Sequence, residues 1–201
     1  MPRRKVIAMK KVGVLGGVFD PIHIGHMHIA DGVLRTLGLS KVILIPAGDP
    51  PHRRSSPIAL GNHRYEMLKL AVSDNLQIEV SDLELRRSGK SYSVDTLIEL
   101  RRIHPDWEIH FIMGADNLGE ILTWKEPEKL FELSRVVVVT RPGARSRSNE
   151  INLPGRVMEI DLPGIDISST QIRNALKDAK PCRYLLPPGV ETYIGRHKLY
   201  A

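Results

Sequence analysis

The sequence predicts an α/β protein built on a doubly wound parallel sheet. Three observations support this prediction: short β-branched runs alternate with longer amphipathic runs, the strand candidates are apolar without alternation, and a glycine-rich turn follows the first of them. In such a sheet, ligands bind beyond the carboxyl ends of the strands, where the strand order reverses. We therefore expect the functional residues in the turns that follow the strands.

The strand candidates are short and rich in valine, isoleucine and leucine. The run KVILIPA at 41–47 is continuously apolar, which is typical of a parallel strand covered on both faces. The expected strands are 11–16, 41–47, 76–82, 107–116 with its exit turn, 135–143 and a short one within 156–164.

The helix candidates carry apolar residues three and four positions apart. In the segment 93–104, Ser93 is expected as the N-cap, and Leu97, Leu100 and Ile103 as the buried stripe. The expected helices are 26–38 ended by Gly38, 62–73, 93–104, a short one within 124–134 that Pro127 could start, 168–178 and a final turn or two within 187–197.

The length of 201 residues suits one domain with a sizeable core. We expect a single domain over 11–201, with a helical C-terminal region from about 165 to 201, and a flexible arm over 1–10. The apolar stretch of this arm is too short for a signal peptide or a membrane span. The only cysteine is Cys182, which excludes an intramolecular disulfide and a cysteine-rich zinc site and fits a cytoplasmic location.

The net charge of +6 serves solubility or attracts anionic partners, either phosphates or nucleic acid. Aromatic residues make up only 5% of the chain, and no run alternates basic with aromatic residues. This composition argues against a stacking platform for single-stranded nucleic acid. We expect no nucleic-acid partner and no membrane partner, and either a monomer or a homo-oligomer.

The first turn holds the string GGVFDPIHIGH, which begins at Gly16 and ends at His26. Gly16 and Gly17 lack a Cβ atom, so their backbone NH groups can approach an anion closely. The next helix is expected to begin near Gly25, which directs its free NH groups and its positive end to the same place. His23 and His26 are three residues apart, a spacing that puts both rings on one side of a helix start.

Other motifs are absent from this turn. The glycine spacing fits neither GxGxxG nor a Walker loop. The standard dinucleotide-binding motif, which would be the main evidence for a hydride-transferring enzyme, is therefore absent. The histidine pair can bind a metal or donate hydrogen bonds to phosphate oxygens; with no third ligand nearby, zinc has weak support. His28 breaks the spacing and is expected to be a surface or packing residue.

A second anion-binding motif, ISSTQIR, ends at Arg173. Ser168, Ser169 and Thr170 can cap a helix and leave NH groups for an anion. Arg173 follows one turn later, where its guanidinium can grip phosphate oxygens. On its own, the segment is better explained by a plain N-cap with a solvated arginine.

Together, the two motifs resemble those of the HxGH nucleotidyltransferase superfamily, GxFxPxHxGH and ISSTxIR. They lie about 150 residues apart, and their joint occurrence makes the resemblance specific. The resemblance implies a Rossmann-like nucleotidyltransferase fold.

Four inner segments resemble those of the bacterial nicotinate-nucleotide adenylyltransferases, and the resemblance covers nearly the whole chain after residue 10. PPHR ends at Arg53, where that family has lysine, so the charge is kept but the shape is not. SYSVDTL has Ser93 in place of threonine, which keeps the hydroxyl. GADNL and TRPG resemble the turns after the fourth and fifth strands.

The resemblance implies transfer of AMP from ATP to nicotinate mononucleotide, with release of pyrophosphate. His23, His26 and Arg173 are the implied catalytic groups, since this chemistry needs charge stabilisation rather than a strong base. Mg²⁺ is expected to arrive bound to ATP, with no protein metal site. The implied ATP-binding residues are Gly16, Gly17, Phe19, His23, His26, His52, Ser168, Ser169, Thr170 and Arg173.

The implied residues for nicotinate mononucleotide are Val18, Asp20, His52, Tyr92, Ser93, Asp116, Trp124 and Arg141. Trp124 is expected to lie against the pyridine ring, with core packing as the alternative. Asp116 is expected at the ribose hydroxyls or as a helix N-cap. Arg141 is expected at the mononucleotide phosphate or as a solvated strand-end residue.

Two alternative functions remain. The chain can be another enzyme of the superfamily, acting on nicotinamide mononucleotide or phosphopantetheine. It can also be a nucleotide-binding or RNA-binding module without chemistry, supported by the positive charge and by the basic run RRK near the start of the chain.

Overall fold

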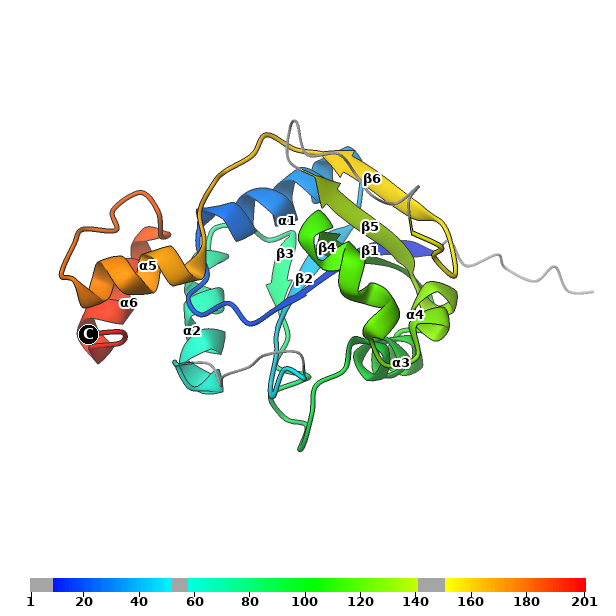
Figure 1. The fold of residues 1–201 in the computed structure, drawn as a ribbon, viewed down its shortest axis with the longest axis horizontal. Helices are drawn as coiled ribbons and strands as arrows, with labels where there is room; N and C mark the ends of the chain where they lie inside the picture. The colour runs from blue at the N-terminus through cyan, green and yellow to red at the C-terminus, as the bar shows by residue number, and fades with distance from the viewer. Residues whose placement is uncertain (1–8, 52–57, 141–150) are drawn as a thin grey trace, which may run out of the picture.

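The computed structural model describes residues 9–51, 58–140 and 151–201. Over these residues the chain forms a six-stranded, all-parallel sheet with the order β3-β2-β1-β4-β5-β6 (Figure 1). The strands are β1 (Lys10–Gly17), β2 (Lys41–Pro46), β3 (Ile78–Val80), β4 (Trp107–Gly114), β5 (Arg135–Thr140) and β6 (Val157–Asp161). The order reverses between β1 and β4, so the predicted doubly wound, Rossmann-like sheet is confirmed.

Helices cover both faces of this sheet, with α1 and α2 on one side and α3 and α4 on the other (Figure 1). The helical elements are α1 (Ile24–Thr36), α2 (Gly61–Ala71), α3 (Ser93–Ile103), the 3₁₀ helix η1 (Ala115–Thr123), α4 (Pro127–Leu133), α5 (Ser169–Lys177) and α6 (Pro188–His197). None of the helices in the described part of the chain has the length and apolar character needed to cross a membrane.

Two apolar cores form, one on each face of the sheet. Because successive side chains of a strand point to opposite faces, Leu15 of β1 joins the core under α1, and Val14 joins the core under α3. Leu34 of α1 and Leu97 of α3 are buried against these two cores. Burial on both faces explains why the strands are continuously apolar.

The C-terminal region packs on the core under α1, beside α2 (Figure 1). Val190 and Ile194 of α6 are buried, one helical turn apart, and Tyr200 is only 9% exposed. The backbone NH of Ile24, at the start of α1, donates to the carbonyl of Leu185 over 3.0 Å. The end of the chain is therefore attached to the turn that follows β1.

Several boundaries differ from the sequence-based expectations. Helix α3 has Ser93 as its first residue, because Tyr92 is the extended residue before it. Ile103, the last residue of α3, is 45% exposed and is not part of the buried stripe. Strand β1 begins at Lys10, inside the expected arm, and residues 1–8 lie outside the described residues.

Candidate active site

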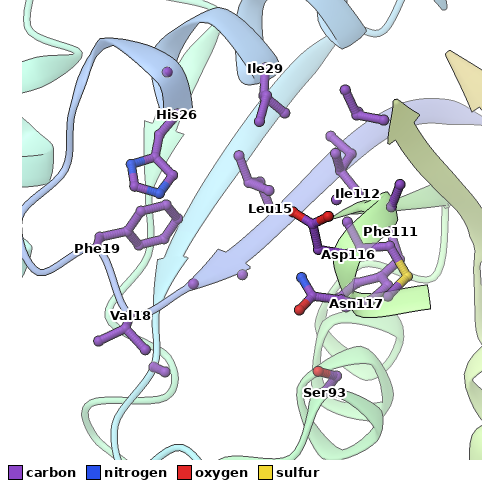
Figure 2. Close-up of a pocket in the computed structure, with 18 of the residues that line it drawn as sticks. Leu15, Val18, Phe19, His26, Ile29, Ser93, Phe111, Ile112, Asp116 and Asn117 are labelled. Carbon is purple, nitrogen blue, oxygen red and sulfur yellow. The ribbon is translucent and has the colours of Figure 1, made fainter. Parts of the chain in front are cut away.

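A cavity of about 650 Å³ opens at the carboxyl ends of the central strands (Figure 2). Gly16 and Gly17 at the end of β1 form one part of its wall, and Gly114 at the end of β4 forms another. The cavity therefore lies where the strand order reverses, as the fold class predicts. Its volume is in the range of small-molecule and cofactor sites.

The turn after β1 is shaped by close contact between Gly17 and Phe19. A Cβ atom on Gly17 would lie 2.9 Å from the Phe19 ring, so no larger residue fits here without a shift. Phe19 itself has φ of 51°, a left-handed conformation that costs about 1–2 kcal/mol for a non-glycine residue. Its buried ring meets the His26 ring edge-on, with the centroids 5.0 Å apart. Phe19 thereby fixes the position of His26 at the cavity (Figure 2).

His23 and His26 lie together at the start of α1, as their spacing predicts. His23 is the N-cap, and the two rings stack with centroids 3.7 Å apart and an interplanar angle of 28°. The backbone NH of His23 donates to Nδ1 of His26 over 3.3 Å. Within the described residues, Nδ1 of His23 has no hydrogen-bond partner.

Burial keeps this imidazole pair neutral. It lowers the pKa of His23 from 6.5 to about 4. Burial, with a smaller contribution from neighbouring His23, holds the pKa of His26 well below its usual value. Two neutral rings can stack this closely without charge repulsion. An anion in the cavity would favour the protonated imidazoles and so raise the pKa of both rings.

The ISSTQIR segment begins α5 at the same cavity. Ser168 is the N-cap: its Oγ accepts from the backbone NH of Gln171 over 3.2 Å, and Oε1 of Gln171 accepts from the backbone NH of Ser168 over 2.8 Å. This reciprocal pair is a capping box. Ser168 and Ser169 line the cavity, so the start of α5 faces the space in front of the histidines.

The two motifs are joined by direct hydrogen bonds. Ser169 Oγ donates to the carbonyl of Pro21 over 2.9 Å. Arg173 Nη1 donates to the carbonyl of Asp20 over 2.7 Å, and its Nη2 donates to Oγ1 of Thr170 over 3.1 Å. Thr170 and Arg173 themselves are not part of the cavity wall. Segments at opposite ends of the chain thus form one site.

Asp20 lies away from the cavity, unlike the other residues expected at the mononucleotide that fall within the described ranges. It is 1% exposed, and its carboxylate accepts from the backbone NH groups of Ile58 and Ala59 over 2.9 and 3.2 Å. It also accepts from the Tyr200 hydroxyl over 2.7 Å. Burial, together with the bond to Asp20, raises the pKa of Tyr200. The Asp20 side chain therefore holds three distant segments together.

Most of the remaining predicted residues also line the cavity. Val18 does so from the turn after β1, and Tyr92 and Ser93 form another wall, where Ser93 begins helix α3. The ammonium group of Lys125 lies 4.9 Å from the centre of the Tyr92 ring and forms a 2.9 Å ion pair with Asp95. This wall therefore combines an aromatic ring, a hydroxyl and a helix N-terminus.

Trp124 and Asp116 also line the cavity. Trp124 is half-buried and meets Phe111 edge-on with the centroids 6.2 Å apart, so it packs on the core and faces the cavity at once. Asp116 is exposed in the first turn of η1, whose N-cap is Gly114, so the N-cap alternative for Asp116 is wrong.

Three further residues of the predicted site lie outside the described residues: His52, Arg53 and Arg141. His28 lines the cavity edge, with its Nε2 2.9 Å from the carbonyl of Pro163. Across the described ranges, no group of three or more histidine, cysteine, aspartate or glutamate side chains gathers to hold a metal ion.

Sequence reasoning missed Glu84, which lines the cavity, and gave no role to Ser91 or Lys125, which also line it. Glu84 lies in the charged stretch LELRRSGKS, which has the composition of a surface connection. No local signal marks it as buried. Tyr200 was missed as well, because its partner lies 180 residues away.

Comparison with known proteins places the chain in a family. A profile described as cytidylyltransferase-like matches residues 14–175. The chain is 44% identical over 199 residues to a probable nicotinate-nucleotide adenylyltransferase of Symbiobacterium thermophilum, covering 96% of each chain. It is 45% identical over 190 residues to one from Thermus thermophilus, covering 94% of this chain and 99% of the relative.

The fold has a close structural counterpart. Nicotinic acid mononucleotide adenylyltransferase of Plasmodium falciparum, solved in complex with NaAD, superposes with a TM-score of 0.80. The match covers 95% of this chain and 97% of that one at 22% identity, so it supports the fold alone. Taken with the relatives above 40% identity over nearly the full length, these findings show that the chain belongs to the nicotinate-nucleotide adenylyltransferases, a nucleotidyltransferase family of NAD biosynthesis.

Proposed function

We propose that this chain transfers the AMP group of ATP to nicotinate mononucleotide, giving deamido-NAD and pyrophosphate. One observation carries the proposal: Ser169 and Arg173 hydrogen-bond to the same turn that presents His23 and His26. Two helix starts, α1 and α5, thus border one cavity. Helix N-termini favour anions, and a triphosphate is long enough to contact both.

In the proposed reaction, a phosphate oxygen of the mononucleotide attacks the α-phosphorus of ATP. The new O–P bond forms as the bond to the leaving pyrophosphate breaks. An ionised phosphate is already a nucleophile, so the protein has to position the reactants and stabilise negative charge. The imidazoles, hydroxyls and backbone NH groups among the residues of the cavity wall suit this task.

In this proposal, His23 and His26 contact the α- and β-phosphates. The unpartnered Nδ1 of His23 supports such a contact, because a buried polar atom normally has a hydrogen-bond partner. The triphosphate would raise the pKa of both rings and draw a proton onto them. Ser169, Thr170 and Arg173 would hold the β- and γ-phosphates, and Arg173 still has guanidinium donors beyond the two bonds described above.

On the other wall, we propose that the pyridine ring lies against Trp124. The Ser93 hydroxyl and the NH groups that open α3 would meet its carboxylate. Asp116 would accept from ribose hydroxyls, and Val18 and Tyr92 would complete the surface around the mononucleotide.

Magnesium enters this proposal as part of the ATP substrate. Bound to the phosphates, it neutralises some of their charge. The donor-rich wall formed by His23, His26 and Ser169 fits phosphate oxygens rather than a bare cation. We further propose a reducing, cytoplasmic location, in keeping with Cys182, the single cysteine of the sequence, which is buried and free.

The decisive experiment measures pyrophosphate release from ATP with nicotinate mononucleotide, nicotinamide mononucleotide or phosphopantetheine. We expect the highest kcat/KM with nicotinate mononucleotide. A higher value with either alternative substrate would reassign the chain to another activity of the wider superfamily. No pyrophosphate with any of them, together with salt-sensitive RNA binding, would indicate a module without chemistry.

A further inference from the structure

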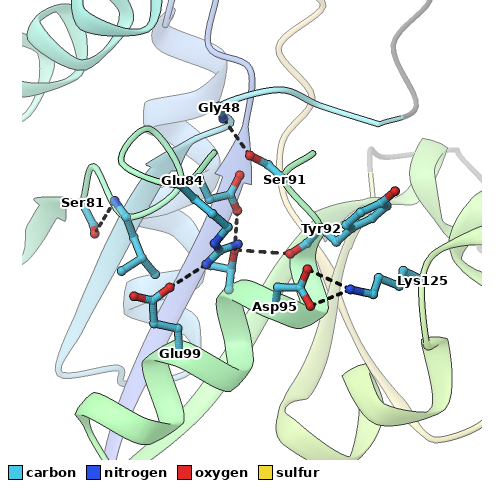
Figure 3. Close-up of polar contacts among 11 residues, drawn as sticks. Gly48, Ser81, Glu84, Ser91, Tyr92, Asp95, Glu99 and Lys125 are labelled. Atoms are coloured by element: carbon cyan, nitrogen blue, oxygen red, sulfur yellow. Dashed lines mark hydrogen bonds and ion pairs between the residues drawn. The ribbon is translucent and has the colours of Figure 1, made fainter. Parts of the chain in front are cut away.

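We propose that Glu84 is a positioning residue for the mononucleotide side of the cavity. Its carboxylate accepts from Thr96 in the first turn of α3 (Figure 3) and, through Ser91, connects to the loop after β2. It thereby sets the distance between two walls of the pyridine subsite. The inference rests on the proposed function, because it names what shapes the pocket for nicotinate mononucleotide. It assigns a task to a buried acid that the proposed chemistry does not use.

Glu84 is a buried acid, and burying a carboxylate is unfavourable unless hydrogen bonds or opposite charges compensate for it. It is 7% exposed, lies in the connection between β3 and α3, and lines the cavity. Its Oε1 accepts from Oγ1 of Thr96 over 2.7 Å, and Thr96 is itself 3% exposed. Burial raises the pKa of Glu84, while the bonds from Thr96 and Ser91 and the charge of Arg87 oppose the rise. A buried carboxylate with these partners holds its neighbours firmly.

On the loop side, Ser91 is the link. Its Oγ accepts from the backbone NH groups of Gly48 and Asp49 over 3.1 and 3.3 Å, which leaves its hydroxyl hydrogen for the Glu84 carboxylate. The chain passes so close here that a Cβ atom on Gly48 would lie 2.5 Å from the Glu84 carbonyl oxygen. The loop after β2 is thus held against the segment that carries Glu84.

On the helix side, Arg87 reinforces the same contact. Its Nη1 donates to Oγ1 of Thr96 over 3.3 Å, and its Nη2 forms a 2.7 Å ion pair with Glu99 (Figure 3). Thr96 therefore accepts from Arg87 while it donates to Glu84. This relay fixes the first turn of α3 relative to the connection before it.

Both segments that Glu84 joins end at the cavity wall. Pro50 and Pro51 follow the loop residues bound by Ser91. Tyr92 precedes the first turn of α3, and Ser93 begins this turn, which also carries Thr96. The histidine pair and the start of α5 stand on other elements, away from the hydrogen bonds that hold Glu84. Loss of the carboxylate should therefore disturb mononucleotide binding more than ATP binding.

The test measures KM for each substrate separately in Glu84→Ala, Glu84→Gln, Thr96→Val and Thr96→Ser, with circular dichroism to establish folding. The matched control is Asp82→Asn, which removes another carboxylate of the same connection; Asp82 pairs with exposed Arg86 and does not line the cavity. Glu84→Ala should raise the KM for nicotinate mononucleotide at least about tenfold, since small misplacements in a site cost up to about a hundredfold. The KM for ATP should rise less than the KM for nicotinate mononucleotide in Glu84→Ala, Glu84→Gln and Thr96→Val.

Conservative variants separate positioning from mere stability. Thr96→Ser keeps the donor and should remain within about twofold of the wild type, whereas Thr96→Val should approach the Glu84→Ala value. Glu84→Gln keeps an acceptor and should fall between the wild type and Glu84→Ala. If Glu84→Ala does not fold, the two Thr96 variants and Glu84→Gln carry the test.

Two results would overturn the inference. In the first, the KM values for both substrates rise equally in the variants. In the second, both KM values stay unchanged in folded Glu84→Gln and Thr96→Val. Either result would show that the network only stabilises the fold. A wild type that releases no pyrophosphate from ATP and nicotinate mononucleotide would overturn the proposed function itself, and this inference with it. The wild-type assay therefore distinguishes the two failures.

Discussion

The buried histidine at the start of α1 makes the fold sensitive to acid in a measurable way. The perturbation is a fall in pH from about 7 to about 4.5, applied to the wild type and to His23→Gln, which has no imidazole to protonate. The pKa of His23 lies near 4 in the folded protein, against 6.5 for an exposed histidine. As the pH falls, the unfolded chain therefore binds the proton first, and the equilibrium shifts toward unfolding.

The magnitude follows from these two pKa values. At about pH 4.5 an unfolded-state histidine is almost fully protonated, whereas the folded His23 is mostly neutral. The linkage relation then gives a loss of about 2.5 kcal/mol from His23 alone. The loss begins as the pH falls through 6.5 and is complete somewhat below pH 4. For a chain of 201 residues, it corresponds to a fall in Tm of about 5–10 °C.

The assay is thermal unfolding of both proteins across this pH range, followed by circular dichroism or calorimetry. All other titrating groups are shared, so the difference between the two Tm curves reports His23 together with its smaller effect on the pKa of His26. We expect the curves to diverge below about pH 6.5, with the wild type losing more stability. Parallel curves down to pH 4.5 would refute the reasoning, because they would mean that the His23 environment does not oppose its charge.

Three further predictions concern the site and its supports. His26→Ala should lower kcat at least about a hundredfold with the fold intact, and normal turnover would exclude a role in charge stabilisation. Tyr200→Phe removes the 2.7 Å hydrogen bond to Asp20, which should lower the free energy of unfolding by about 1.5–3 kcal/mol and Tm by about 3–12 °C. The same change at Tyr184, which is 81% exposed, should leave Tm nearly unchanged. Equal effects of the two substitutions would contradict the structural role of Tyr200. The pocket should favour nicotinate over nicotinamide mononucleotide in kcat/KM, because helix NH groups donate to a carboxylate; equal values for the two substrates would rule this out.

The sheet could be predicted because its signal is local. Valine-rich and isoleucine-rich runs between amphipathic segments mark parallel strands wherever both faces are covered, and the run 135–140, which forms β5, is the clearest case. The weakest strand, β3, has only three residues, since it lies at the sheet edge and pairs with β2 alone. Helix α6 is longer than expected because its apolar residues pack on the core, which outweighs the poor helix propensity of Gly189 and Gly195.

The location of the cavity could be predicted for a similar reason. Both motifs carry their own helix starts, and the fold class directs the turn after β1 to the switch point. The orientation of single side chains could not be predicted, because distant partners decide it. The Asp20 carboxylate is buried and accepts a hydrogen bond from Tyr200, and the Glu84 carboxylate is buried and accepts one from Thr96. Neither partner is visible in the local pattern.

The bonds around the first turn explain how a backbone loop can become an anion site. Its carbonyl oxygens carry negative partial charge that would repel a triphosphate. Here the carbonyls of Val18, Asp20 and Pro21 accept from Arg64, Arg173 and Ser169 respectively, over 2.7 to 2.9 Å. These donors come from α2 and α5, so the packing of remote helices satisfies the acceptors of the turn. Two of the three donors are cationic, and they therefore add positive potential behind the histidine pair while they fix its geometry.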